Sequence, residues 1–254
     1  MGKKAQIKRG KVRPDFSHLI RRHCVPLHAI AVDDNLNGGL NITGGTALLW
    51  ETICGRFYVT AYHVWEKLAE LTQGPSPDYH FFTYDLLGPI RIYHPRLIDA
   101  SEELDLAVFT ALGIMDGDPT GKSFLQTHIW PPAPAKSGDM IVGCGYPGDM
   151  RMFFKGHWEQ NILIWANRKC TVSESGERIL LYAEPGKGQA AYFTRTEPQG
   201  LSLPGISGAP LFALRDTLDW VGVVRSGVGE LLNGFSIQAT PSGFLHPDGR
   251  IRKI

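Results

Sequence analysis

Three short stretches of the sequence contain residue types that together could carry out nucleophilic acyl transfer. They are VTAYHVW around His63, ELDLAVF around Asp105 and GISGAP around Ser207. A serine hydroxyl is a weak nucleophile at neutral pH and needs a base within hydrogen-bonding reach. A histidine that serves as this base needs a carboxylate to fix its tautomer and to stabilise the imidazolium. The residue types therefore suggest a nucleophilic serine with a histidine base and an orienting carboxylate.

Each of the three residues also has an ordinary structural explanation when it is taken alone. A histidine in an apolar strand is more often a hydrogen-bonded core residue than a catalyst, and the glycine, serine and proline of GISGAP are what any turn uses. Asp105 could cap a turn, and Asp99, Glu102 or Glu103 could supply the carboxylate in its place. What favours chemistry is the chain order histidine, aspartate, serine, with intervals of 42 and 102 residues.

The elements that must position these residues are short β-strands. Runs rich in β-branched and aromatic residues are separated by Gly, Pro, Asn and Asp, and TALLW, ETICGR and FYVTAYHVW together predict a hairpin. Only residues 63–74 (HVWEKLAELTQG) have a helical apolar pattern. Many short strands with one helix predict an all-β barrel or sandwich. The proline-rich residues 128–138 would link two halves, roughly 23–127 and 139–254, each forming a small barrel.

The composition of the 254 residues, 43% hydrophobic and 20% charged, is typical of a soluble globular protein. No apolar run is long enough to span a membrane, and the N-terminus lacks the apolar segment of a secretory signal. The four cysteines are widely spaced, which argues against a disulfide framework or a zinc site. GCGYPG at residues 143–148 fits a dinucleotide-binding pattern, but no amphipathic helix follows it. We therefore expect a cytoplasmic protein with reduced thiols and with no metal or cofactor.

The basic residues are concentrated in an N-terminal arm, residues 1–22. This arm contains eight Lys or Arg against one acid and has a charge of +7, which leaves −6 for residues 23–254. Terminal residues are often poorly ordered, so a solvated and flexible arm is the favoured interpretation. The alternative is contact with nucleic acid through the arm, between Lys3 and Arg22.

The three stretches together resemble the motifs of the trypsin/chymotrypsin-like serine peptidases (PA clan), nearer to the bacterial HtrA/Deg type than to secreted digestive enzymes. TAYHV is similar to the family's T-A-x-H, DLAVF to D-[LIV]-A-[LV] and GISGAP to G-x-S-G-x-P. VGVVRSGVG and NGFSIQATP resemble the strands that line the substrate cleft, so the resemblance spans roughly residues 28–242. It implies a chymotrypsin-like double barrel of two six-stranded antiparallel β-barrels, with the active site between them and a protein or peptide substrate.

The resemblance also implies a role for each site residue. Ser207 would be the nucleophile, His63 the general base and then acid, and Asp105 the orienting carboxylate. The backbone N–H groups of Gly205 and Ser207 would form the oxyanion hole, where glycine permits the backbone twist that aims the N–H. The primary specificity pocket would have an apolar floor and glycine walls, which favours an apolar substrate side chain. Its residues would be Leu201 at the floor and Gly227 and Gly234 along the walls.

Three departures from the family pattern bear on regulation and activity. Ile206 stands where secreted zymogens carry an acid that pairs with a freed N-terminus, so control would fall to a protein partner or to ordering of residues 195–205. Val64 follows His63 where the family has a disulfide cysteine, in agreement with a reducing compartment. Arg225 replaces a small serine beneath the triad and could pair with Asp105 or rearrange the cleft. The expectation is an intracellular serine endopeptidase of a regulatory or defence pathway; the alternative is a catalytically silent protease fold that acts as a binding module.

Overall fold

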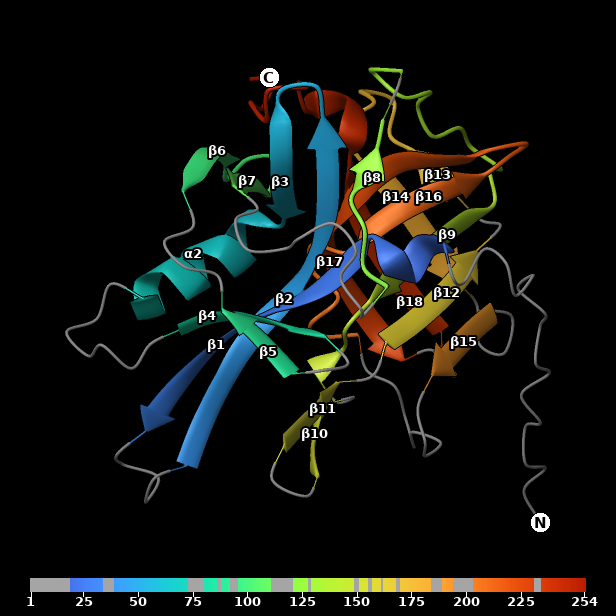
Figure 1. Ribbon diagram of the computed structural model, residues 1–254. Helices are drawn as coiled ribbons and strands as arrows, with labels where there is room; N and C mark the ends of the chain where they lie inside the picture. Colours follow the sequence, from blue (N-terminus) through green and yellow to red (C-terminus); the bar gives the residue numbers. More distant parts are fainter. Residues whose placement is uncertain are drawn as a thin grey trace, which may run out of the picture.

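Strand pairing divides the protein into two β-sheets, which lie side by side in Figure 1. The structure is a computed structural model that describes residues 19–33, 39–72, 80–85, 88–91, 96–110, 121–127, 129–148, 151–154, 157–160, 162–167, 170–183, 189–193, 203–230 and 234–254. The N-terminal arm lies outside these residues as far as position 18. Its last residues, 19–22, form a helical turn in which Ile20 is completely buried.

The first sheet has the strand order β5-β4-β1-β2-β3-β7-β6, with β8 paired to β2. Its neighbouring strands are antiparallel except for the β2–β8 pair. The predicted hairpin is confirmed as β2 and β3, with Thr52 paired to Gly55 across a two-residue turn. The strands are β1 (Cys24–Asp33), β2 (Gly39–Thr52), β3 (Gly55–Thr60), β4 (His80–Asp85), β5 (Gly88–Arg91), β6 (Leu97–Ser101), β7 (Leu106–Thr110) and β8 (Leu125–Gln126).

The second sheet has the strand order β13-β14-β18-β17-β16-β9-β12-β15, and all of its neighbouring strands are antiparallel. A separate hairpin joins β10 (Arg151–Phe154) to β11 (His157–Gln160). The strands of the sheet are β9 (Ile141–Gly145), β12 (Ile162–Asn167), β13 (Cys170–Val172), β14 (Ile179–Ala183), β15 (Gln189–Phe193), β16 (Pro210–Leu214), β17 (Leu218–Glu230) and β18 (Gly234–Pro241).

The predicted helix is α2 (Tyr62–Thr72), which directly follows β3. Val64 and Leu68 are buried on one face, whereas Glu66 and Lys67 are exposed on the other. This spacing is that of a helix that lays one apolar stripe on a sheet. Figure 1 shows α2 against the first sheet, so the helix presents its first turn at the end of β3.

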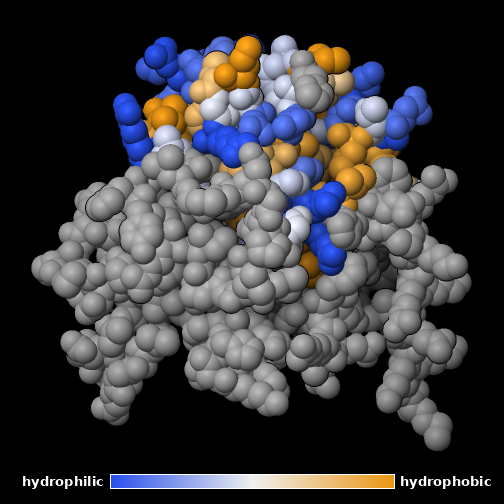
Figure 2. Space-filling view, viewed as in Figure 1, coloured by the Kyte–Doolittle hydropathy of each residue, from blue (hydrophilic) through white to orange (hydrophobic). Residues whose placement is uncertain are grey.

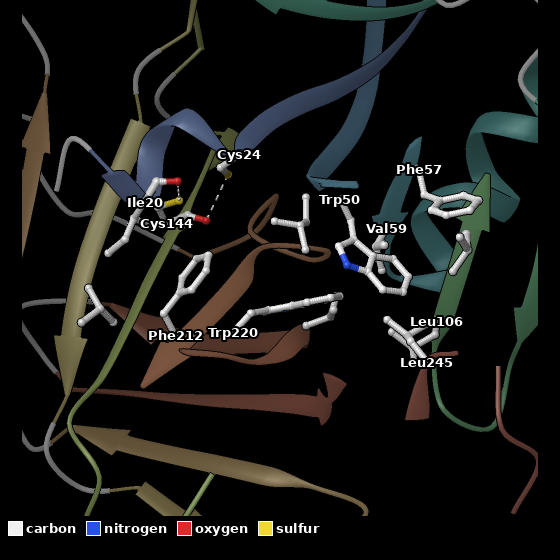
Figure 3. Packing of buried hydrophobic residues seen from close by; sticks show 14 of the residues in the cluster. Ile20, Cys24, Trp50, Phe57, Val59, Leu106, Cys144, Phe212, Trp220 and Leu245 are labelled. Atoms are coloured by element: carbon white, nitrogen blue, oxygen red, sulfur yellow. Dashed lines mark hydrogen bonds between the residues drawn. The ribbon is translucent and has the colours of Figure 1, made fainter. Parts of the chain in front are cut away.

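A shared hydrophobic core joins the two sheets. Trp50 of β2 and Trp220 of β17 meet at 5.4 Å between ring centroids, and Figure 3 shows them facing one another from opposite sheets. Trp130 of the inter-sheet segment lies 5.0 Å from Trp50 and 5.7 Å from Trp220. Large aromatic side chains dominate the energy of burial. The three tryptophans therefore hold both sheets and their connection together.

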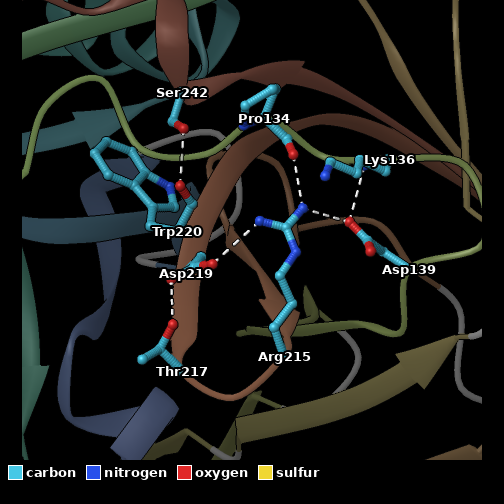
Figure 4. Close-up of polar contacts among 8 residues, drawn as sticks. All are labelled: Pro134, Lys136, Asp139, Arg215, Thr217, Asp219, Trp220 and Ser242. Atoms are coloured by element: carbon cyan, nitrogen blue, oxygen red, sulfur yellow. Dashed lines mark hydrogen bonds and ion pairs between the residues drawn. The ribbon is translucent and has the colours of Figure 1, made fainter.

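Residues 129–140 connect the two sheets and are fixed to the second one by Arg215 (Figure 4). The Arg215 guanidinium donates to the Pro134 carbonyl oxygen and to Asp139 Oδ2, both at 2.6 Å, and to Asp219 Oδ2 at 3.1 Å. Burial alone would raise the pKa of Asp139, but hydrogen bonds from Arg215 and from the Lys136 amide outweigh burial and lower that pKa below its ordinary value. The connection is thus an ordered part of the fold.

The segment after β18 returns to the first sheet through the short 3₁₀ helix η3 (Ser242–Phe244). Two hydrogen bonds attach it there: Thr52 Oγ1 donates to the Pro247 carbonyl at 2.6 Å, and the Ile251 amide donates to Asp99 Oδ2 at 2.8 Å. A third bond, from Trp130 Nε1 to the Leu245 carbonyl at 2.8 Å, attaches it to the inter-sheet segment. Residues near the C-terminus therefore close against strands from the first half of the chain.

The all-β, two-sheet fold predicted from the sequence, that of a chymotrypsin-like double barrel, is confirmed. Each sheet contains eight strands rather than six, because short edge strands such as β5, β8, β13 and β15 join the principal ones. All four cysteines are free thiols; Cys24, Cys144 and Cys170 are buried and Cys54 is exposed. Within the described part of the chain, no helix has the length and apolar character needed to cross a membrane.

Candidate active site

Two neighbouring strands bring His63 and Asp105 together. β3 ends at Thr60 and leads into α2, which has His63 in its first turn. β7 begins at Leu106, immediately after Asp105, and its register pairs Ala107 with Thr60. His63, three residues after the end of β3, thus lies beside Asp105, the residue before β7. Thr60 is buried, whereas the His63 side chain is 50% exposed.

The His63 imidazole is paired with the Asp105 carboxylate. Its Nδ1 lies 3.0 Å from both Oδ1 and Oδ2, and the His63 backbone N–H donates to Oδ1 at 3.1 Å. The Asp105 side chain is only 13% exposed. A carboxylate at Nδ1 holds the ring proton on that nitrogen and leaves Nε2 as the acceptor. With the carboxylate at Nδ1, this geometry leaves Nε2 of His63 free of Asp105.

The other carboxylates considered from the sequence lie elsewhere. Asp99 accepts the Ala100 amide at Oδ1 and the Ile251 amide at Oδ2. Glu102 and Glu103 are exposed, and neither contacts His63 in the described structure. Asp105 alone among the four is placed to orient the imidazole.

Ser207 lies in a turn that hydrogen bonds hold between the two sheets. Its carbonyl oxygen accepts the Thr46 amide of β2 at 2.8 Å, and the next residue, Gly208, donates to the Val224 carbonyl of β17 at 2.8 Å. Gly208 has φ of +86°, and a Cβ there would overlap the Thr46 carbonyl oxygen and the Thr60 hydroxyl. Only glycine fits this close approach. The turn is thus fixed from both sides.

Gly45 marks the point where the histidine and serine segments converge. A Cβ at Gly45 would lie 2.7 Å from the Val64 side chain and 2.8 Å from the Ser207 carbonyl oxygen. The residue after His63 and the main chain of Ser207 therefore both pack closely against one glycine. No hydrogen bond joins the His63 and Ser207 side chains in the described structure. In unliganded enzymes this contact is often long and tightens when substrate binds.

The backbone conformation around Gly205 sets the direction of its amide N–H. Its φ is +97°, and a Cβ would lie 2.7 Å from the Gly148 nitrogen and 3.0 Å from the Tyr146 carbonyl oxygen. The Pro204 carbonyl accepts the Gly148 N–H at 2.7 Å. Because C=O and N–H point in opposite directions across a trans peptide, this bond directs the Gly205 N–H away from Gly148. Among the described residues, neither the Gly205 nor the Ser207 amide donates to a protein acceptor.

Two of the residues that the sequence assigned to substrate binding, Gly227 and Gly234, lie on the β17–β18 hairpin at different distances from the serine turn. A Cβ at Gly227 would contact Ile206 and Leu203, so Gly227 packs against the serine turn. Gly234 is paired with Glu230 at the far end of the hairpin. Leu201 lies outside the described residues. Gly227 therefore lies at the serine turn, whereas Gly234 of β18 lies opposite Glu230, three residues beyond Gly227 on β17.

Arg225 is placed at a β-bulge. The register between β17 and β18 shifts between Val224 and Ser226, so Arg225 is the extra residue. Val224 donates to the Ala209 carbonyl and accepts from the Gly208 amide, which places Arg225 directly beside the serine turn. Within the described chain Arg225 makes no ion pair with Asp105, so the pairing considered from the sequence is not formed.

Sequence reasoning missed Thr46, which contacts the serine turn with both its backbone and its side chain. Thr46 Oγ1 donates to the Gly205 carbonyl at 3.1 Å and accepts the Tyr146 amide at 3.0 Å. Thr60 Oγ1 donates to the Thr46 carbonyl at 2.7 Å. The adjacent glycines 44 and 45 were the available signal, because glycine within a strand marks a close approach of backbone.

A pocket of about 460 Å³ lies between α2, β6 and the turn after β6, and neither His63 nor Asp105 is among the described residues that line it. Tyr62 donates a hydrogen bond to Glu66 Oε1 at 3.0 Å, and this bond together with nearby carboxylates raises the pKa of Tyr62. Among the described residues no group of three His, Cys, Asp or Glu could hold a metal ion. The pocket is lined by Tyr62, Trp65, Glu66, Ala69, Glu70, Leu97, Ala100 and Glu102.

On the face shown in Figure 2, the described apolar side chains lie in separate groups among hydrophilic ones. Scattered apolar side chains are normal on protein surfaces and mark no binding site by themselves.

Comparisons with known proteins find similarity in structure only. No family model and no curated protein matches the sequence. Solved structures that resemble the chain include the HtrA-type protease AlgW with a tripeptide, at 14% identity over 90% of this chain and with a TM-score of 0.47. Deg5 matches at 17% identity over 91% of both chains, with a TM-score of 0.46. The thermostable serine protease AL20 from an extremophilic microorganism matches at 15% identity over 87% of this chain and 93% of its own, with a TM-score of 0.46. The match covers 60% of AlgW.

Proposed function

We propose that this protein is a serine endopeptidase that hydrolyses peptide bonds of a protein substrate. The observation that supports this function best is the His63–Asp105 pair, in which Nδ1 is 3.0 Å from both carboxylate oxygens. A half-exposed imidazole held in this way next to the Ser207 turn is arranged for proton transfer rather than for core packing.

In the proposed reaction, His63 Nε2 removes the Ser207 proton while Oγ attacks the substrate carbonyl carbon. The oxyanion that forms accepts hydrogen bonds from the Gly205 and Ser207 amides. The amide C–N bond then breaks as His63 returns the proton to the leaving nitrogen, which leaves an ester on Ser207. A water molecule, deprotonated by His63, attacks this ester and restores the free hydroxyl and the carboxylic acid product.

The conformation of Gly205 supports the oxyanion hole. Its positive φ and the Gly148–Pro204 hydrogen bond turn the Gly205 amide away from protein acceptors. A pre-aimed amide costs no reorganisation during the reaction, and a donor of this kind contributes about 10²–10³ in rate. In the proposed reaction this amide would stabilise the oxyanion of the transition state.

Ile206 supports a mode of control different from that of secreted zymogens. Its side chain is completely buried in the core of the second sheet. Apolar packing thus anchors the residue before the nucleophile, where an ion pair with a freed N-terminus would otherwise do so. We propose that a partner or the target protein controls activity by acting on residues 195–205, and that Gly227 lines a subsite for an apolar side chain.

A fluorophosphonate probe tests the proposed function directly, because it forms a bond with activated serines only. We expect wild-type protein to be labelled at Ser207 by peptide mass spectrometry, and Ser207→Ala to be unlabelled. Ser175→Ala is the matched control, since Ser175 is an exposed turn serine. Wild-type protein that stays unlabelled, alone and with candidate partners, would refute the enzyme and favour the silent binding module.

A further inference from the structure

Asp105 has a backbone conformation that residues with side chains rarely adopt. Its φ is +50°, and it is the only described non-glycine residue with positive φ. The left-handed region is disfavoured for all L-residues, although aspartate tolerates it better than most. Such a conformation persists only where the surroundings hold it in place.

Hydrogen bonds fix both ends of the peptide that precedes Asp105. Its N–H, which belongs to Asp105, donates to the Glu102 carbonyl at 3.0 Å. Its carbonyl, which belongs to Leu104, accepts the Thr240 hydroxyl at 2.5 Å. The Leu104 amide on the other side donates to Ser101 Oγ at 3.2 Å. These bonds fix the peptide plane before Asp105, and β7, which begins at Leu106, holds the chain after it, so φ of Asp105 is set from both sides.

Thr240 reaches this peptide from the other sheet. It lies on β18, where the register pairs it with Val223, and it is 136 residues away from Leu104 in the chain. Thr240 is 0% exposed and Leu104 2%. A hydrogen bond shielded from water is stronger than an exposed one, and a buried carbonyl left without its donor is costly. This contact is therefore a strong link between the second sheet and the Asp105 turn.

We propose that Thr240 is a positioning residue for Asp105. Rotation of the Leu104–Asp105 peptide would turn the carboxylate away from His63 Nδ1, and the Thr240 hydroxyl prevents that rotation. The expected effect on kcat rests on the proposed peptidase function, whereas the orientation of the Asp105 carboxylate toward His63 does not. Thr240 itself touches neither substrate nor reacting atoms.

Thr240→Val tests the proposal, because it removes the hydroxyl while keeping the shape of the side chain. We expect kcat for a cleaved peptide to fall on the order of tenfold with KM almost unchanged, well short of the ~10⁴-fold loss that follows when the histidine tautomer is wrong. Thr240→Ser keeps the donor and should restore kcat to within about twofold of wild type.

Ser242→Ala is the matched control. Ser242 is 2% exposed and donates to the Trp220 carbonyl at 2.9 Å, so its hydroxyl ties η3 to β17 and, in the described structure, forms no bond with the Asp105 turn. Its loss should affect thermal stability but not kcat. An equal fall in kcat in Thr240→Val and Ser242→Ala would overturn the positioning role, because a general loss of packing would then explain both.

The proton on His63 Nδ1 gives a readout that does not depend on activity. Hydrogen-bonded imidazole protons give downfield resonances, and we expect this one to shift or broaden in Thr240→Val and to remain in Thr240→Ser and Ser242→Ala. If Thr240→Val does not fold, Thr240→Ala removes the same donor with a smaller side chain. A changed resonance in a protein that fluorophosphonate never labels would support the positioning role while refuting the peptidase function. An unchanged resonance and an unchanged kcat would overturn the role of Thr240.

Discussion

Replacing Asp105 with asparagine isolates the orienting role of its carboxylate. Both carboxylate oxygens lie 3.0 Å from His63 Nδ1, and Oδ1 also accepts the His63 backbone N–H. An asparagine keeps its oxygen on that backbone N–H and places its NH₂ group beside Nδ1. Two donors then face one another, which favours the tautomer with the proton on Nε2. This nitrogen can no longer accept the Ser207 proton.

The expected loss follows from the change of tautomer. Asp105→Asn should lower the rate constant of fluorophosphonate labelling by about 10³–10⁴, which corresponds to about 4–5.5 kcal/mol of transition-state stabilisation. Thermal stability should change little, because the side chain keeps its shape. Labelling reactions that are stopped at a series of times and analysed by mass spectrometry give this rate constant.

Glu103→Gln is the control, since Glu103 is an exposed carboxylate two residues from Asp105 that lies outside the pair. It should label at the wild-type rate. A rate constant for Asp105→Asn within about tenfold of wild type would refute the reasoning, because a correct tautomer would then be available without the carboxylate.

Three further predictions concern stability. Gly208→Ala would place a methyl group against the Thr46 carbonyl at a φ of +86°. Urea unfolding should show that the free energy of unfolding falls by about 2–3 kcal/mol. A smaller fall than in the exposed control Gly176→Ala would contradict this. Arg215→Met should lower the free energy of unfolding by about 2 kcal/mol, because the carboxylates of Asp139 and Asp219, 17% and 26% exposed, lose their partner. Arg250, whose ion pair with Asp248 is exposed, is the control, and an effect no larger than that of Arg250→Met would contradict the prediction. The lowered pKa of Asp139 means that its contribution is present above 3.8, the ordinary value, and is lost as the pH falls through the lower folded value. The difference in unfolding free energy between wild type and Arg215→Met should therefore shrink from neutral pH to below pH 3.8, and a difference that grows on acidification would show that Asp139 is not involved.

The sequence predicted the features that depend on local pattern. Alternating strands, the β2–β3 hairpin and the helix after His63 follow from residue periodicity and turn residues, and the structure contains all of them. The order of histidine, aspartate and serine pointed to the three residues, and the structure brings the first two into contact. The number of strands was harder to predict, because short edge strands such as β8 have only two residues.

The residues that support the site could not be identified from the sequence. Thr46 and Thr240 lie on strands, where threonine is common for its β-branched shape alone, and nothing local distinguishes a threonine that reaches another sheet. Arg225 illustrates a second limit. A bulge adds one residue to its strand, and nothing in the local sequence placed one at Arg225; the pairing with Asp105 that the sequence left open is not formed among the described residues.

The return of the C-terminal segment to the first sheet has a consequence for protein synthesis. The Ile251 amide donates to Asp99, and the Pro247 carbonyl accepts the Thr52 hydroxyl. During synthesis, β2 and β6 are therefore made well before the residues that bond to them. The Thr240 hydroxyl reaches Leu104 only when β18 has emerged as well. A ribosome-bound chain would therefore carry an unsupported Asp105 turn until β18 has left the exit tunnel. We expect the contact between His63 and Asp105 to form in the nascent chain only after residues 234–251 have docked.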